Sequence, residues 1–508
     1  MTEYDLDLQS IQEARQLAVA ARDAQRLWAK ASQAEVDRAC AAMAEAAYLA
    51  SERLGRMASE ETGYGVPAHK TLKNHLGSKL VWESIKDVKT VGVVEHDARK
   101  KVYRIAWPMG VVAALTPSTN PTSTVMFKTL IAVKGRNSIV VAPHPAAVKC
   151  CVETARLMAE AGERAGMPQG VVSCMSKVSL PGTQELIKHR YVALILATGG
   201  GEMVKAAHSV GKPAYGVGPG NVPCYVDRSA DIQQAARYIV ASKAFDYSVL
   251  CSTEQAVIAD KPIARQLEEL IKAEGAYFVD DAQADALRHT LFFPGGGINA
   301  QSVGKSPQQL AQMAGISVPA STRILVARLT KVGRDEPLSR EKLTTVLGWY
   351  EADGWEAGCE RCIEMINFGG RGHSLVIHAR DEKVIMAFGL EKPVFRIVVN
   401  TLGTLGTTGF TTGVMPSMTL GPGGYGGAIT GDNITVYHMF NVKRLAYEIN
   451  PPPEAAMHGG DPSSVARLAV EDAVERSEMR RGPIAAGPGV PTDQIDEIVK
   501  KVLAELKR

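Results

Sequence analysis

Long apolar runs and a surplus of one charge are both absent from this sequence. No apolar run among its 508 residues approaches the roughly 18 residues that span a bilayer, so we expect no membrane contact. The 57 basic and 54 acidic side chains are spread along the chain, which argues against a nucleic-acid partner. The acidic start Met1-Thr-Glu-Tyr-Asp lacks an apolar signal segment, and we expect a cytoplasmic protein.

Cysteines are few and follow no disulfide framework. The eight cysteines therefore predict free thiols and a reducing compartment. Cys359 and Cys362 form one CxxC pair in a helix-like stretch, without histidines at zinc-ligand spacing, so we interpret the pair as structural and predict no metal. A hydrophobic content of 45% over this length indicates a globular protein of two or three domains.

Short apolar runs alternate with helical stretches between residues 111 and 211, which predicts a parallel sheet covered by helices. We expect strands at 111–115, 139–142, 171–174 and 192–197, and helices at 122–133, 147–165 and 202–210. Such sheets bind ligands at the carboxyl ends of their strands. Two ends suit a ligand, one at 115–121 and one at 197–201, where glycines let a phosphate approach the backbone. For the segment 197–201 the alternative to phosphate binding is a turn without a ligand, because the chain contains no GxGxxG motif.

Cys251 is the candidate nucleophile. It lies in a short polar-flanked segment between a helical repeat and a strand-like run at 256–259, so we expect it on a connection, where reactive groups concentrate. The alternative is an unreactive buried thiol.

The regions on either side are also patterned. An alanine-rich helical start precedes a predicted hairpin at 90–107 with a charged tip, which we expect to serve oligomer contacts. A second α/β lobe is expected from Cys251 to about residue 390, and the glycine-rich and threonine-rich stretch 403–431 predicts loops near a site or a flexible surface connection. Regular structure is expected to resume at 441–448.

The end of the chain predicts a separate amphipathic helix. Residues 481–491 have the composition of a Gly/Pro linker. Six apolar side chains then recur at helical spacing, namely Ile495, Ile498, Val499, Val502, Leu503 and Leu506. This helix either folds back on its own domain or docks into the groove of a partner.

Several motifs in a fixed order carry a resemblance to a known family. They are Thr116-Pro-Ser-Thr-Asn-Pro-Thr122, Ala197-Thr-Gly-Gly-Gly-Glu-Met-Val-Lys205, Gly216-Val-Gly-Pro-Gly-Asn-Val-Pro223, the Cys251 segment, Glu336-Pro-Leu-Ser-Arg-Glu-Lys-Leu343, Gly369-Gly-Arg-Gly-His-Ser374 and Pro416-Ser-Met-Thr-Leu-Gly421. Residues 108–447 thereby resemble the CoA-acylating aldehyde dehydrogenases of the aldehyde dehydrogenase superfamily, of the type associated with bacterial microcompartments.

The resemblance implies an α/β aldehyde dehydrogenase fold with a Rossmann-like NAD-binding domain, an α/β catalytic domain and a small oligomerisation hairpin, assembled as a homodimer or homotetramer. We place N-terminal helices and the NAD-binding domain at 1–220, with the hairpin at about 89–107, and the catalytic domain carrying Cys251 at 221–420. A return segment with C-terminal helices follows at 421–480, then the linker at 481–491. Residues 492–508 resemble an encapsulation peptide for microcompartment shell or core proteins, which implies a location in the microcompartment lumen.

The family's catalytic roles carry over to three residues. Cys251 would attack the aldehyde, and the Asn120 side chain with the Cys251 N–H would hold the oxyanion. Hydride would leave to NAD, and the thiol of coenzyme A would intercept the thioester left on Cys251. His373 would accept a thiol proton, unless it merely shapes its glycine turn.

The cofactor roles carry over to two loops and an acid. Thr198 and Gly199 resemble the pyrophosphate contact, and we add Thr116, Pro117, Ser118, Gly200 and Gly218 as cofactor-binding candidates. Glu336 resembles the nicotinamide ribose ligand, with an ordinary solvated acid as the alternative. Ala142-Pro-His-Pro145 lacks the lysine that many hydrolytic members use to bind the adenosine ribose. The preference between NAD and NADP therefore stays open.

One absence shapes the predicted reaction. Hydrolytic members carry a glutamate that activates water, and Val217 stands at that position, where it cannot abstract a proton. We therefore expect reversible, NAD-dependent oxidation of a small aldehyde to acyl-CoA. The alternatives are a hydrolytic aldehyde dehydrogenase and an inactive shell-associated scaffold. Acetaldehyde, propionaldehyde and sulfoacetaldehyde all remain open as substrates.

Overall fold

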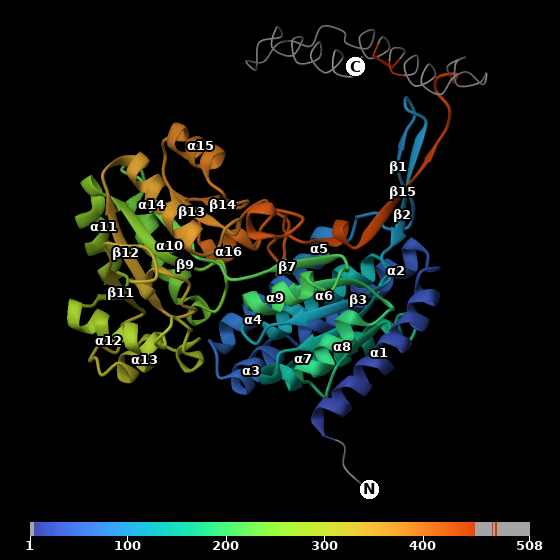
Figure 1. Ribbon diagram of the computed structural model, residues 1–508, viewed down its shortest axis with the longest axis horizontal. Helices are drawn as coiled ribbons and strands as arrows, with labels where there is room; N and C mark the ends of the chain where they lie inside the picture. Colours follow the sequence, from blue (N-terminus) through green and yellow to red (C-terminus); the bar gives the residue numbers. More distant parts are fainter. Residues whose placement is uncertain (1–4, 453–469, 471–472, 475–508) are drawn as a thin grey trace, which may run out of the picture. The chain divides into compact units, whose positions relative to one another are not determined.

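The computed structural model describes residues 5–452, 470 and 473–474. Its strands form a five-stranded, a seven-stranded and a three-stranded sheet. In Figure 1 the five-stranded sheet and its helices run from blue to green, and the seven-stranded sheet and its helices from green to orange. The predicted linker at 481–491 and helix at 492–508 lie outside the described residues.

The five-stranded sheet is parallel and has the strand order β5-β4-β3-β6-β7. Its strands are β3 (Val111–Thr116), β4 (Ser138–Pro143), β5 (Val172–Cys174), β6 (Val192–Thr198) and β7 (Ala214–Val217). Val112 and Ala114 belong to one hydrophobic core, whereas Val111, Ala113 and Leu115 belong to another. Both faces are therefore covered, which is why these strands appear in the sequence as continuous apolar runs.

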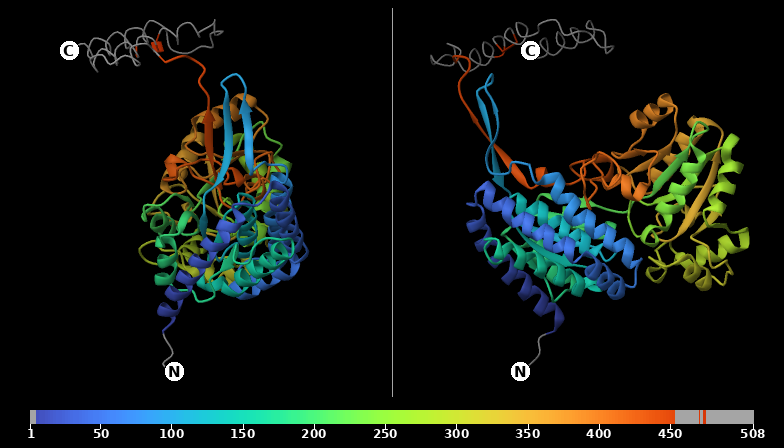
Figure 2. Two further views of the ribbon diagram at one scale, coloured as in Figure 1. Left: turned by 90° about the vertical axis from the view of Figure 1, so that its right-hand side faces the viewer. Right: turned by 180° about the vertical axis from the view of Figure 1, so that it is seen from behind.

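Helices cover the two faces of this sheet (Figure 2): those of residues 33–49, 121–134 and 148–164 contribute to the core on one face, and those of residues 6–28, 180–188 and 201–208 to the core on the other. The helices that precede it are α1 (Leu6–Trp28), α2 (Gln33–Leu49), α3 (Ser51–Thr62), α4 (Pro67–His75) and α5 (Val81–Ile85). Those between its strands are α6 (Pro121–Lys134), α7 (Val148–Arg164), α8 (Leu180–Lys188) and α9 (Gly201–His208).

The order in which strands are added reverses between β3 and β6: β4 and β5 follow on one side of β3, and β6 and β7 on the other. Loops at such a switch point diverge and leave a crevice for a ligand. The buried ammonium of Lys128, on α6, donates to the carbonyls of Leu115 (2.7 Å) and Leu196 (3.0 Å) and so ties the two strand ends together. Both predicted ligand loops, at 115–121 and 197–201, follow these strands.

The seven-stranded sheet is also parallel, with the order β10-β11-β12-β9-β8-β13-β14. Its strands are β8 (Val222–Val226), β9 (Glu254–Asp260), β10 (Ala276–Phe278), β11 (Ile324–Arg328), β12 (Val346–Ala352), β13 (Leu375–His378) and β14 (Ile397–Val399). Its helices are α10 (Ile232–Ala244), α11 (Lys261–Ala273), α12 (Asp281–Leu291), α13 (Pro307–Met313), α14 (Gly354–Phe368), α15 (Glu382–Glu391) and α16 (Gly403–Thr407).

The three-stranded sheet has the order β1-β2-β15, formed by β1 (Gly92–Asp97), β2 (Val102–Pro108) and β15 (Phe440–Ala446). The hairpin predicted at 90–107 and the regular structure predicted at 441–448 are thus confirmed. Apolar side chains on this sheet are exposed, namely Val93, Trp107 and Leu445.

The α/β fold and the predicted strands and helices of residues 111–211 are confirmed, with ends that differ by a few residues. Three details differ. The helix α8 between β5 and β6 was not predicted, the second lobe extends to β14, and the glycine-rich stretch opens with the short helix α16. The domain boundaries proposed from the sequence stay predictions.

Candidate active site

Four candidate residues converge at the amino edge of the seven-stranded sheet. Gly220, Cys251, Glu341 and His373 come shortly before β8, β9, β12 and β13. These strands are consecutive neighbours in the sheet, in the order β12-β9-β8-β13. Because parallel strands all begin at the same edge, Gly220 and His373, 153 positions apart in the chain, are brought to one place.

Gly220 is the contact point of this group. A Cβ added to it would lie 2.1 Å from the Cys251 carbonyl oxygen and 3.1 Å from the His373 ring. Its N–H donates to Glu341 Oε1 at 2.8 Å. Any side chain at this position would collide with the backbone of the cysteine loop, so the close approach of Cys251 and His373 requires glycine here.

Cys251 is partly exposed, yet its thiol holds its proton tightly. Burial raises the pKa of the Cys251 thiol to about 12, and the charge of Glu341 adds to this effect, while Arg396 opposes it. A thiol with this pKa is almost wholly protonated at neutral pH. Attack on a carbonyl therefore needs a neighbouring group that accepts its proton.

Asn120 links the five-stranded sheet to the cysteine loop. It ends the β3 loop, immediately before α6, and is buried. Its Nδ2 donates to the carbonyl oxygen of Val249 at 3.3 Å, only two residues before Cys251 in the sequence. The amide N–H group thus faces the cysteine loop, and its predicted role as an oxyanion donor stays a prediction.

His373 is a buried, neutral histidine with a free ring nitrogen. Burial and the charge of Arg396 lower the pKa of His373 to about 3. Nδ1 shares a hydrogen bond with Ser374 Oγ at 3.0 Å, and Nε2 has no partner among the residues that the structure describes. A buried nitrogen without a partner is costly in an empty protein interior, which indicates that a ligand group reaches it.

Two acids of the same motif have different surroundings. The two oxygens of Glu336 accept hydrogen bonds from Arg288 Nε (3.0 Å) and Nη2 (2.7 Å). Glu341 instead lines a cavity of about 920 Å³ together with Asn221 and Arg340. Burial raises the pKa of Glu341 to about 7, although the Gly220 N–H opposes the rise. Glu341 was not among the residues predicted from the sequence, and the ribose role of Glu336 stays a prediction.

A second cavity, of about 580 Å³, has the features of a dinucleotide site. Gly201 and Lys205 of α9 line it together with Gly218 and His373. Gly200 has open space where a side chain would lie, so a pyrophosphate can approach the first turn of α9 and its free N–H groups.

The remaining predicted cofactor residues lie at the two strand ends. Thr116 Oγ1 is buried and lacks a partner among the described residues, and Pro117 and Ser118 follow it directly. Thr198 Oγ1 is paired with Thr419 Oγ1 at 2.9 Å, which leaves the backbone of the Thr198–Gly199 turn for a ligand. These residues fit the pyrophosphate half of NAD.

Within residues 5–452, 470 and 473–474, no group of three His, Cys, Asp or Glu side chains is placed to hold a metal ion. No helix in that part of the chain is long and apolar enough to cross a membrane. Cys359 and Cys362 lie buried on α14, where Cys359 accepts a hydrogen bond from Lys392.

The sequence model of the aldehyde dehydrogenase family matches residues 5–287. The chain belongs to the aldehyde dehydrogenase family. The aldehyde-alcohol dehydrogenase of Streptococcus pneumoniae is 42% identical over 414 residues, which cover 80% of this chain and 47% of that protein. The chain thus spans about half the length of such aldehyde-alcohol dehydrogenases. An acetylating aldehyde dehydrogenase of Geobacillus thermoglucosidasius is 48% identical, with a TM-score of 0.87 over 89% of this chain and 100% of that structure.

More distant solved structures of this family carry ligands or come from a microcompartment. A propionaldehyde dehydrogenase of Rhodopseudomonas palustris, solved with bound CoA and an acylated cysteine, is 27% identical, with a TM-score of 0.79 over 85% of this chain and 97% of that one. A propionaldehyde dehydrogenase of a Clostridium phytofermentans fucose-utilisation microcompartment is 29% identical, with the same TM-score and coverage. Variants of the latter enzyme with a cysteine or a histidine replaced by alanine have also been solved.

Proposed function

We propose that this chain is a CoA-acylating aldehyde dehydrogenase that converts a small aldehyde, NAD and CoA into acyl-CoA and NADH. The observation that carries the proposal is the meeting of Cys251 and His373 at Gly220. Val217 supports it, because a buried valine replaces the water-activating glutamate of hydrolytic members. The solved relative with bound CoA and an acylated cysteine supports the same chemistry.

The first half-reaction forms a thioester on Cys251. The carboxylate of Glu341, whose charge acts on the Cys251 thiol, accepts the thiol proton as the sulfur attacks the aldehyde carbon, and later releases it to solvent. The Asn120 Nδ2 and the Cys251 N–H stabilise the negative charge that develops on the carbonyl oxygen. NAD, when bound, supplies the hydride acceptor. Loss of hydride from the former aldehyde carbon restores the carbonyl and leaves the acyl group on sulfur.

The second half-reaction transfers the acyl group to CoA. Nε2 of the neutral His373 has no partner among the described residues, so it accepts the proton of the CoA thiol and passes it to the Cys251 thiolate. The CoA sulfur then attacks the thioester, and Cys251 leaves as thiolate. Exchange of one thioester for another is close to balanced in energy, so we propose that the enzyme also reduces acyl-CoA with NADH.

Hydrolysis is the second candidate, because Glu341 has a pKa near 7 and is close enough to raise the pKa of Cys251. A carboxylate with this pKa is suited to activate water. Mass spectrometry of the products from acetaldehyde, propionaldehyde and sulfoacetaldehyde, with and without CoA, decides between the two. Acyl-CoA as the main product supports our proposal. Free carboxylate at saturating CoA, lost in Glu341→Gln, supports hydrolysis.

We also propose that the three-stranded sheet mediates oligomer contacts, because its exposed Val93, Trp107 and Leu445 would be covered there.

On the sequence alone, we propose that residues 492–508 direct the enzyme into a microcompartment. Fusion of this segment to a fluorescent protein tests the idea in cells that produce the matching shell. Signal confined to shells supports it, and diffuse signal contradicts it.

A further inference from the structure

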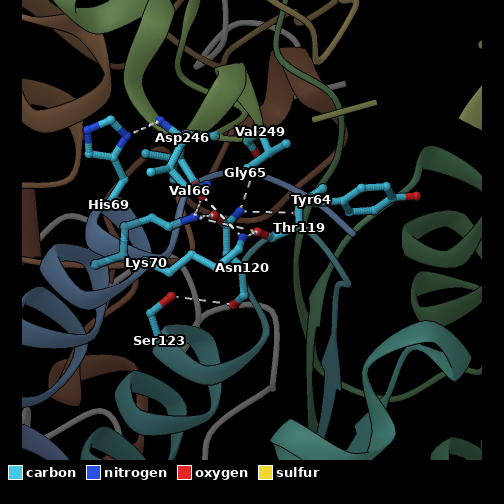
Figure 3. Close-up of polar contacts among 12 residues, drawn as sticks. Tyr64, Gly65, Val66, His69, Lys70, Thr119, Asn120, Ser123, Asp246 and Val249 are labelled. Atoms are coloured by element: carbon cyan, nitrogen blue, oxygen red, sulfur yellow. Dashed lines mark hydrogen bonds and ion pairs between the residues drawn. The ribbon is translucent and has the colours of Figure 1, made fainter. Parts of the chain in front are cut away.

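Two buried lysines of α4 lie against the residues that flank the proposed nucleophile. Lys70 and Lys73 are only 2% and 3% exposed, and both ammonium groups contact the fully buried carboxylate of Asp246. Figure 3 shows Lys70, Asp246 and Asn120 pointing toward one another. The Lys70 Nζ to Asp246 Oδ2 distance is 3.2 Å.

The two lysines differ in one contact. Both donate to the backbone oxygen of Thr119, Lys70 at 3.2 Å and Lys73 at 3.5 Å, but only Lys73 Nζ also donates to Asn120 Oδ1, at 2.5 Å. An ammonium group can only donate, so it fixes the amide oxygen of Asn120 on its own side. The amide nitrogen must then face the other way, where it donates to the Val249 carbonyl oxygen at 3.3 Å. The contacts of Asn120 Nδ2 with the Val249 carbonyl and with Thr119 Oγ1, the latter at 3.1 Å, favour the same orientation, and the charge-assisted bond from Lys73 is the strongest of the three.

Asp246 also holds the loop that leads to Cys251. Its Oδ1 accepts the Val66 N–H at 2.7 Å, and its own N–H donates to His69 Nδ1 at 2.9 Å. Asp246, Tyr247 and Ser248 have φ values of 49°, 50° and 65°, a left-handed run that side-chain-bearing residues adopt only under constraint. The cluster on α4 supplies that constraint, so it fixes both Asn120 and the cysteine loop.

The charges of the cluster do not balance. Two ammonium groups share one carboxylate, and Lys70 alone would neutralise Asp246. Burial lowers the pKa of Lys73 to about 7, and Lys70 lowers it further, while Asp246 opposes the change. In its charged form Lys73 is therefore a surplus buried cation, which costs stability and which the ion pair of Lys70 with Asp246 does not need.

We propose that Lys73 is a positioning residue that presents the Asn120 N–H group to the oxyanion. This inference rests on the proposed function, because it assigns Lys73 a role only in reactions that pass through a tetrahedral oxyanion at Cys251. Lys70 has the same helix, burial and carboxylate partner but no contact with Asn120, and is therefore the matched control.

A double-mutant cycle on the full-length enzyme tests the proposal. We expect Lys73→Met to lower kcat by about 30-fold while KM for the aldehyde changes by less than about threefold. We expect Lys70→Met to lower kcat by no more than about threefold. In the Asn120→Ala background, Lys73→Met should have no further effect, since its loss acts through the amide. Equal losses in the two lysine variants, or losses at Lys73 and Asn120 that multiply, would overturn the proposal.

Two further measurements keep the test decisive. Alkylation of Cys251 by iodoacetamide has no oxyanion, so its rate in Lys73→Met should stay within about twofold of wild type, and a large change would indicate a displaced loop instead. If Lys73→Met does not fold, the same cycle is run with Lys73→Gln, which keeps an N–H donor; its smaller loss must also vanish in Asn120→Ala. A wild-type enzyme that forms no NADH from any aldehyde, with or without CoA, would refute the proposed function and the inference with it. An active wild type with a multiplying cycle refutes the inference alone.

Discussion

Replacement of Glu341 by glutamine is expected to stabilise the protein above pH 7 while it impairs activity. Burial raises the pKa of Glu341 from 4.5 to about 7. Between these values the carboxyl group is charged in the unfolded chain but protonated in the folded protein, so stability falls as the pH rises. The full loss above pH 7 is about 3 kcal/mol, because each tenfold change in an ionisation constant corresponds to about 1.4 kcal/mol. Glutamine does not ionise, so the variant does not lose this stability as the pH rises. Its amide oxygen can still accept the hydrogen bond from the Gly220 N–H.

Calorimetric melting of both proteins at pH 5 and pH 8 measures the effect. The entropy of unfolding is about 2.1 cal/mol/K per residue, or about 1 kcal/mol/K for this chain, so the variant should melt about 3 °C higher than wild type at pH 8 and about 1 °C higher at pH 5. Glu336→Gln is the matched control, since loss of its ion pair with Arg288 should lower the midpoint at pH 8. A Glu341→Gln difference that does not change with pH, or that is negative at pH 8, would refute the buried-carboxyl argument.

Three substitutions test the assigned roles individually. Cys251→Ala should abolish aldehyde oxidation with NAD binding retained, as measured by NADH absorbance and nucleotide titration, and appreciable turnover would remove the nucleophile assignment. Asn120→Ala should lower kcat by about 100-fold, and an unchanged kcat would exclude an oxyanion role. His373→Ala should keep the first-turnover burst of NADH but slow CoA-dependent turnover by about 100-fold. An unchanged steady-state rate with CoA would show that His373 does not transfer the proton.

Much of the fold could be predicted from local pattern. The strands of the five-stranded sheet are buried on both faces, so each appears as a continuous apolar run bounded by glycine, proline or a helical repeat. Cys251 stands out locally because it lies in a short segment between a predicted helix and a predicted strand, whereas Asn120 was assigned from the resemblance of its motif to the family. The switch point between β3 and β6 explains why the ligand loops at 116–118 and 198–200 fall together.

The remaining site residues could not be found in this way, because they depend on strand order. Nothing local places the start of β12 beside that of β9, so the sequence cannot decide whether Glu336 or Glu341 enters the cavity. Lys73 is hidden for the same reason: a lysine on an early amphipathic helix is ordinarily solvated, and its contact with Asn120 spans 47 residues. Burial of a charged side chain is a tertiary property that helical spacing does not encode.

A single-turnover experiment without CoA tests the central claim, that the thioester on Cys251 persists until CoA arrives. With excess aldehyde and NAD, we predict one NADH per active site and then a halt, with the acyl mass found on the peptide that contains Cys251. Addition of CoA should release that mass as acyl-CoA and restart NADH formation. Continued NADH formation without CoA, accompanied by free carboxylate and an unmodified Cys251 peptide, would contradict the account.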